Sequence, residues 1–209
     1  LKELAENYEA DIIWPDGEWD YPSERHCSKE YLAWLYNESK VKDTVVVNDR
    51  WGRDCRGRHG GHYTTEYLLE GGDASGDVSS HPWEECRGIG LSFGYNRFET
   101  TEHYLSNEAC VESLCDKVSR GGNLLLNIGP TADGLIPVIM QERLLAMGKW
   151  LAVNGEAIYG TSAWEKRPRD MKKNRVYFTQ KGTDVYVIAF GSAEKVTVPD
   201  AGAVKSVTL

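Results

Sequence analysis

Short apolar runs that alternate with helical patterns restrict the fold of this chain more than any other feature. Runs typical of β-strands lie at residues 11–14, 44–48, 88–93 and 123–128, and helical patterns separate some of them. Strands joined by crossover helices pair in parallel, and the runs TVVVN and NLLLNIG have the composition of strands buried on both faces. We therefore expect an α/β fold built on a parallel sheet, either a barrel or an open sheet.

Helix ends are marked by residues that cap helices. A helix is expected from the first residues of the chain, and Ser28 and Ser106 each precede an amphipathic pattern, so both serines are predicted N-caps. The helix after Ser106 is expected to end at Gly121-Gly122, and a further helix is expected over residues 141–153.

The pattern changes from about Trp164 onward. A basic segment leads into RVYFTQ, TDVYVIAF and KVTVPD, short alternating runs separated by turns that contain Gly. These runs predict a second, antiparallel domain, and we place the domains at residues 1–163 and 164–209. Three or four strands are too few for a closed sandwich, so we expect the C-terminal domain to be truncated.

Composition excludes several partners. The chain has 209 residues, of which 41% are hydrophobic, enough for a substantial core. Its net charge of −8 argues against nucleic acid as a partner, although residues 50–62 are locally basic and are interpreted as a solvated, partly paired loop. No apolar run approaches the roughly 20 residues of a membrane helix, so no membrane partner is expected. The chain begins at Leu1 inside a helical pattern, from which we expect an N-terminal portion to be missing.

The five cysteines are scattered and odd in number, which fits neither a disulfide scaffold nor a zinc site. Cys110 and Cys115 share a helical face with Val111, Leu114 and Val118, so we predict that both are core residues.

Chemistry is concentrated in residues 12–20, IIWPDGEWD. Here a strand-like run breaks at Pro15 into a loop that holds three carboxylates and two indoles, Asp16, Glu18, Asp20, Trp14 and Trp19. Loops at the C-terminal ends of parallel strands converge on one pocket in α/β barrels. Carboxylates supply an acid, a base or a nucleophile, and indole faces suit sugar rings, so the loop predicts chemistry on a carbohydrate.

Other kinds of site fit less well. Asp-x-Glu-x-Asp resembles the start of a calcium loop, but the expected Gly and Glu are replaced by Tyr21 and Cys27, so no metal is expected. Neither a Gly-x-x-x-x-Gly-Lys phosphate loop nor a Gly-x-Ser-x-Gly elbow occurs. Glycoside hydrolysis needs a second acid, for which Glu66 in HYTTEY is the best candidate, whereas Glu84, Glu85 and Glu99 lie in ordinary charged segments.

Six segments together resemble family 29 of the glycoside hydrolases, the retaining α-L-fucosidases. They follow the family's order over roughly residues 1–164 and are IIWPDGEWD, VVVNDRWG, HGGHYTTEY, GIGLSFGYNR, GGNLLLNIGP and RLLAMGKWLAVNGEAIYGT. The resemblance implies a partial (β/α)8 TIM-like barrel, its second half, over residues 1–163 and the beginning of an antiparallel β-sandwich over residues 164–209. The family's upstream segments, which carry histidines and aromatics for the fucose hydroxyls, have no match in this sequence.

The resemblance also implies roles for individual residues. The nucleophile of the family's W-x-D segment corresponds to Asp16, and the acid/base of its T-x-E-Y segment corresponds to Glu66. Residues similar to the family's fucose contacts are Trp14, Arg50 and Phe93.

The function implied is retaining hydrolysis of terminal α-L-fucose from a fucosylated glycan by double displacement, with no cofactor. A secreted, periplasmic or lysosomal location goes with that family. The alternative is a truncated, non-catalytic carbohydrate-binding or partner-dependent half-barrel, which would associate as a homo-oligomer or with a missing N-terminal half. The presence of both acids favours the enzyme, and the unmatched upstream half favours the alternative.

Overall fold

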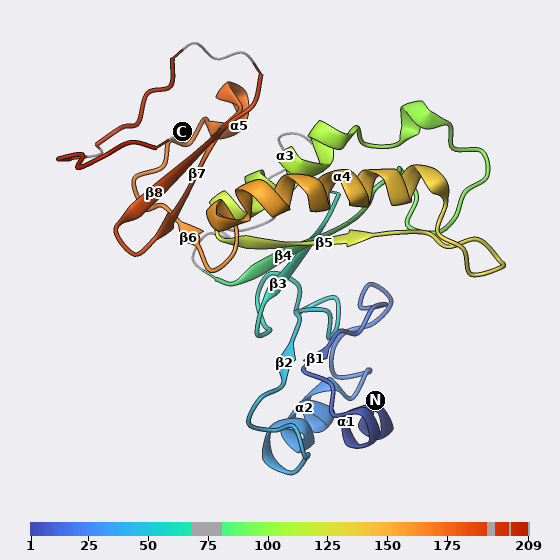
Figure 1. Ribbon diagram of the computed structural model, residues 1–209. Coiled ribbons are helices and arrows are strands. Elements are labelled where there is room, and N and C mark those ends of the chain that lie inside the picture. The colour runs from blue at the N-terminus through green and yellow to red at the C-terminus, as the bar shows by residue number, and fades with distance from the viewer. Residues whose placement is uncertain (68–80, 192–194, 201, 209) are drawn as a thin grey trace. The chain divides into compact units, whose positions relative to one another are not determined.

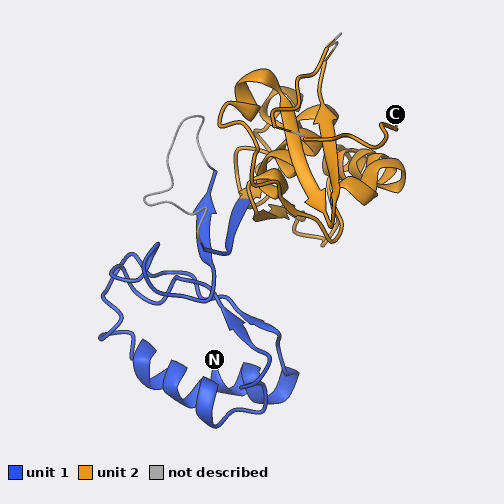
Figure 2. Cartoon of the chain, turned by 90° about the vertical axis from the view of Figure 1, so that its left-hand side faces the viewer, with its two compact units in different colours: residues 1–86 blue, residues 87–209 orange. Residues whose placement is uncertain are grey.

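The computed structural model describes residues 1–67, 81–191, 195–200 and 202–208 (Figure 1). The chain forms two compact units, residues 1–86 and residues 87–209, which are described separately (Figure 2).

The first unit begins with a parallel strand pair covered by two helices. Its elements are α1 (Lys2–Tyr8), β1 (Ile12–Ile13), α2 (Ser28–Asn37) and β2 (Val46–Val47). Ile13 and Val47 are register partners and are buried with Ala5 of α1 and Leu35 of α2 in one core cluster. This pairing confirms the predicted parallel arrangement for the first two strands.

The other parallel pair of this unit is formed by β3 (Tyr63–Glu66) and β4 (Trp83–Gly88), and β4 continues across the boundary into the second unit. Thr64 pairs in register with Glu84, and Glu66 with Cys86. Register partners in a parallel pair point to the same face of the sheet, so these four side chains share one face.

The second unit combines a helical layer with an antiparallel sheet. Its elements are η2 (Thr101–His103), α3 (Asn107–Ser119), β5 (Gly122–Asn127), α4 (Val138–Asn154), η3 (Gly155–Ala157), β6 (Ser162–Ala163), α5 (Met171–Asn174), β7 (Val176–Lys181) and β8 (Asp184–Ala189). The strand order β6-β7-β8 is antiparallel, which confirms the change of pattern near Trp164. Cys110 and Cys115 are fully buried in the core of this unit, as predicted.

Helix starts and ends agree with the sequence in part. The hydroxyl of Ser106 accepts a hydrogen bond from the Ala109 N–H at 3.1 Å, which confirms the predicted N-cap of α3. The predicted cap at Ser28 is wrong, because the Ser28 hydroxyl donates to the Trp51 carbonyl instead and Cys27 precedes the helix. α4 begins at Val138, three residues before the predicted start.

Three strand predictions are wrong. The strand expected at residues 88–93 lies upstream, at Trp83–Gly88. KVTVPD forms no strand in its described residues 195–200, and the short strand β6 pairs with β7 instead. β2 and β5, expected to be buried on both faces, are not, since Val46 and Leu125 are each 42% exposed, and Ile12 of β1 is 53% exposed. In the described part of the chain these strands therefore have one open face.

Candidate active site

The acidic loop begins directly after β1 and contributes two carboxylates with different surroundings. The Asp16 side chain is 54% exposed, whereas the Glu18 side chain is 3% exposed and accepts a hydrogen bond from Arg56 Nη1 at 3.1 Å. Asp20 is exposed. Glu18 therefore fastens this loop to the loop after β2, while Asp16 is left accessible to a ligand.

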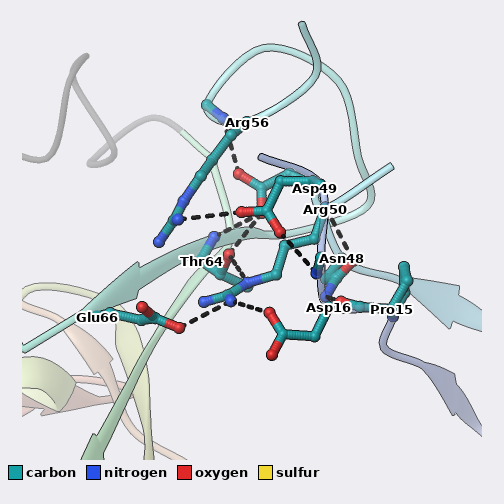
Figure 3. A network of polar contacts seen from close by, with 11 residues as sticks. Pro15, Asp16, Asn48, Asp49, Arg50, Arg56, Thr64 and Glu66 are labelled. Atoms are coloured by element: carbon teal, nitrogen blue, oxygen red, sulfur yellow. Dashed lines mark hydrogen bonds and ion pairs between the residues drawn. The ribbon is translucent and has the colours of Figure 1, made fainter. Parts of the chain in front are cut away.

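Arg50 joins the two predicted catalytic acids. It follows β2, its side chain is fully buried, and Nη1 lies 2.7 Å from Asp16 Oδ1 and 2.8 Å from Glu66 Oε1 (Figure 3). Because both oxygens contact the same nitrogen, they lie no more than about 5.5 Å apart, the two distances end to end. Burial alone would lower the pKa of Arg50, but the bonds to Glu66 and Asp16 outweigh it, so the pKa is raised.

Glu66 is the last residue of β3, 50 residues after Asp16, and 36% of its side chain is exposed. The Trp14 ring also lies against Arg50, with the guanidinium carbon 4.8 Å from the ring centroid. Four of the predicted site residues, Trp14, Asp16, Arg50 and Glu66, are thus brought together in the first unit. Two accessible carboxylates beside a buried cation and an indole can act as nucleophile and acid/base on a sugar.

A cavity of about 530 Å³ in the first unit borders the Asp16 carboxylate. Its lining includes Pro15, Gly17, Glu18, His26 and Arg50.

Phe93, the fifth predicted site residue, belongs to the second unit and is half-buried. Its carbonyl accepts a hydrogen bond from Asn127 Nδ2 at 2.6 Å, and the neighbouring Ser92 N–H donates to Glu99 Oε1 at 2.7 Å. These bonds fix the loop that carries Phe93. Glu99, which the sequence placed in an ordinary charged segment, therefore has a specific structural partner.

Glu84 was also underestimated from sequence. It is half-buried on β4, on the sheet face that carries Glu66 and Cys86. Burial raises the pKa of Glu84, and the charges of His62 and Arg50 oppose that rise. Burial likewise raises the pKa of the Cys86 thiol to about 11, so this neighbour of Glu66 is neutral at physiological pH. A strand predicted over residues 83–88 would place Glu84 and Cys86 on one face of the sheet.

Within residues 1–67, 81–191, 195–200 and 202–208, no group of three His, Cys, Asp or Glu side chains is arranged to hold a metal ion. The described helices include none that is long and apolar enough to cross a membrane.

Comparisons of this chain with known proteins all point to the same family. A family model described as alpha-L-fucosidase matches residues 1–156. The tissue alpha-L-fucosidases of Bos taurus and Homo sapiens are each 46% identical over 189 residues, which make up 90% of this chain and 39% and 40% of those proteins. The chain thus spans about 40% of the length of these curated relatives.

Solved structures agree with these relatives. A Thermotoga maritima alpha-L-fucosynthase in complex with alpha-L-Fuc-(1-2)-beta-L-Fuc-N3 is 42% identical with a TM-score of 0.69, and the match covers 88% of this chain and 39% of that one. Alpha-L-fucosidase isoenzyme 1 from Paenibacillus thiaminolyticus is 29% identical with a TM-score of 0.73, covering 91% of this chain and 46% of that one.

Proposed function

This chain belongs to the alpha-L-fucosidase family of glycoside hydrolases, and we propose that it carries the two catalytic carboxylates of a retaining exo-α-L-fucosidase. The observation that carries this proposal is the bridge that Arg50 makes between Asp16 and Glu66. Retaining glycosidases hold their two carboxyl groups roughly 5–5.5 Å apart, and the bridged oxygens lie within that distance. The substrate proposed is a glycan with a terminal α-L-fucose.

In the first step, Asp16 attacks the anomeric carbon while the bond from that carbon to the leaving oxygen breaks, and Glu66 donates its proton to that oxygen. In the second step, Glu66 takes a proton from water, and the water oxygen displaces Asp16. Two inversions retain the configuration. Glu66 must carry a proton to act as the acid, and its other oxygen can then still accept a hydrogen bond from Arg50 Nη1.

The aromatic contacts are part of the same proposal. Trp14 lies beside Arg50, where its ring can pack against a sugar. Phe93 is proposed as a further fucose contact, to the C5 methyl group, because of the family resemblance.

We also propose that residues 1–163 form the C-terminal half of a (β/α)8 barrel and residues 164–209 the start of a β-sandwich. The parallel pairs β1-β2 and β3-β4 and the antiparallel order β6-β7-β8 support this division. A non-catalytic carbohydrate-binding homologue is less well supported, because such a protein does not need two carboxylates held by one buried arginine.

Removal of the nucleophile tests the function. Asp16→Gly, in a preparation where the barrel is complete, should abolish hydrolysis of an aryl α-L-fucoside, and sodium azide should restore part of the turnover. Azide fits the space left by the carboxylate and attacks the same carbon, which gives β-fucosyl azide. Product analysis by NMR identifies the anomer.

The exposed Asp20→Gly is the matched control from the same loop and should retain activity. If Asp16→Gly kept normal kcat, the nucleophile would be another carboxylate, and Glu18 and Asp20 would be the next candidates.

A further inference from the structure

We propose that Asp49 and Thr64 are positioning residues that orient Arg50 between the two catalytic acids. The inference rests on the proposed function, because Arg50 can affect turnover through Asp16 and Glu66 only if these are the reacting carboxylates. Neither Asp49 nor Thr64 contacts either acid in the hydrogen bonds that define the site, so both would act through Arg50 (Figure 3).

The Asp49 carboxylate fixes the direction of the Thr64 hydroxyl. Asp49 is fully buried, and three donors surround it: Gly57 N–H at 2.7 Å, Thr64 N–H at 3.0 Å and Thr64 Oγ1 at 2.7 Å. An ionised carboxylate only accepts hydrogen bonds. The one hydroxyl proton of Thr64 must therefore point at Asp49.

Thr64 then presents a lone pair to Arg50. With its proton committed to Asp49, Thr64 Oγ1 can only accept at its other contact, which is Arg50 Nε at 2.9 Å. The two bonds have a single consistent direction, from Arg50 to Thr64 to Asp49. If Asp49 were replaced by a group that donates, the hydroxyl could turn and its proton would oppose the Nε–H.

The bond at Nε sets the position of Nη1, because the guanidinium is planar and rigid. Nη1 is the nitrogen that contacts both acids, whereas Nη2 is buried with no hydrogen-bond partner in residues 1–67, 81–191, 195–200 and 202–208. The Trp14 ring, whose centroid lies 4.8 Å from the guanidinium carbon, also restrains the plane. Thr64 is thus the uncharged contact that fixes the orientation of the Arg50 guanidinium before substrate binds.

Two threonines on one strand make a matched test. Thr64→Val and Thr65→Val remove a hydroxyl from neighbouring buried residues that face opposite sides of β3, and Thr65 Oγ1 has no hydrogen-bond partner among the described residues. With 4-nitrophenyl α-L-fucoside and a preparation with a complete barrel, Thr64→Val should lower kcat by about 10- to 100-fold, the worth of one bond to a charged group, with a smaller change in KM. Thr65→Val should stay within about twofold, and Thr64→Ser, which keeps the hydroxyl, should recover most of the activity.

Coupling to Arg50 separates positioning from a general structural role. Lysine has no Nε–H fork, so in an Arg50→Lys background the change Thr64→Val should cause little further loss. If the fold-losses in kcat of Thr64→Val and Arg50→Lys multiply in the double variant, the positioning role is overturned. It is also overturned if Thr64→Val and Thr65→Val are equally active.

A spectroscopic measurement on the same preparation does not depend on activity. In protein with ¹⁵N-labelled arginine, the Nε–H of Arg50 should give a slowly exchanging resonance, identified by its loss in Arg50→Lys. The resonance should shift and exchange faster in Thr64→Val and Asp49→Asn, and should be retained in Thr64→Ser and Thr65→Val. An unchanged resonance in Thr64→Val overturns the inference. Absence of turnover in the wild-type preparation with a complete barrel overturns the proposed function alone, and the resonance then still decides the role of Thr64.

Discussion

Arg50 serves three acceptors with one rigid group. Nε donates to Thr64, and the two hydrogens of Nη1 are directed to Asp16 and Glu66. A lysine ammonium has all its donors on one atom at the end of a flexible chain and cannot reproduce that fork. Because the side chain is fully buried, the charge is stabilised by these two carboxylates rather than by water.

Glu66→Ala should separate substrates by their leaving groups. A general acid matters most when the leaving oxygen is a weak leaving group, so kcat/KM for natural fucosyl linkages should fall by more than about 100-fold, and much less for 4-nitrophenyl α-L-fucoside. The pH dependence of kcat/KM checks the assignment, because its alkaline limb should flatten in the variant.

Glu84→Ala is the informative comparison, since Glu84 is the half-buried carboxylate on the same sheet face as Glu66. Equal losses on good and poor leaving groups in Glu66→Ala, with the alkaline limb retained, would assign the acid to another carboxylate.

The sequence identifies the four residues that lie together around Arg50 better than it identifies their neighbours. Asp16, Glu66, Arg50 and Trp14 were selected from motifs, and the structure brings them together. Glu84 was dismissed because the strand that carries it was placed five residues too late, at 88–93, and a shifted strand hides which side chains share a face. Contacts such as that of Asp49 with Thr64 depend on where the loop after β2 meets strand β3, which no local sequence pattern contains.

At the scale of elements, the loops after β1 and β2 are tied together where a glycine permits close approach. Ser23 donates from N–H and Oγ to the two carboxylate oxygens of Asp54, at 2.7 and 2.8 Å. A Cβ at Gly52 would lie 2.2 Å from the Ser23 nitrogen, which is backbone and cannot turn away.

Gly52→Ala should therefore lower the free energy of unfolding of the first unit by about 1–3 kcal/mol and reduce turnover, because these loops carry Asp16 and Arg50. Gly148→Ala is the control: a Cβ there meets nothing within 4 Å, and alanine in the middle of α4 should stabilise the second unit by about 1 kcal/mol. Urea unfolding followed by circular dichroism measures both. A Gly52→Ala protein as stable as wild type would mean that the loops are not held this close together.

A second contact between elements should make stability depend on pH. The side chain of Arg175, just before β7, pairs with Glu112 of α3, and Tyr177 donates to the same carboxylate at 2.9 Å. The hydrogen bond from Arg175 lowers the pKa of Glu112 below its ordinary value of 4.5. A carboxyl group whose pKa is lowered by folding stabilises the folded state above its unfolded pKa and loses that contribution as pH falls through the folded pKa.

Glu112→Gln should accordingly destabilise the second unit at pH 7, and the difference from wild type should shrink as pH falls below about 4.5. Urea unfolding across the acidic range measures it. Glu142→Gln removes an exposed partner of Arg143 and should have a small effect at every pH. A Glu112→Gln difference that stayed constant down to low pH would contradict the ion-pair explanation.

The elements show where sequence patterns are sufficient. α3 was predicted at its N-terminus because Ser106 acts through a local bond to Ala109, three residues away. Ser28 has the same residue type and position, but its hydroxyl bonds to Trp51, 23 residues further along the chain. A tertiary contact thus replaced a local one, which the sequence does not reveal.

The parallel strands β1 and β2 leave apolar surface open. Ile12 and Val46 are register partners and both are exposed, on the face of the β1-β2 pair opposite the core with α1 and α2. We propose that this apolar face associates with other protein. The described residues contain five strands, β1 to β5, before the antiparallel sheet, fewer than the roughly eight of a closed barrel.

We predict that the 209-residue chain alone shows little or no α-L-fucosidase activity, because the half barrel that we propose for residues 1–163 would leave strand edges and one wall of the proposed site open. Light scattering should show association through the open face, and Val46→Lys should weaken it, whereas Val153→Lys, at an exposed position on α4, should not. Addition of the N-terminal half of a related fucosidase should give an assembly with raised activity towards aryl α-L-fucosides. A monomer of the chain with full activity would contradict the half-barrel proposal and require residues 1–163 to form a complete site by themselves.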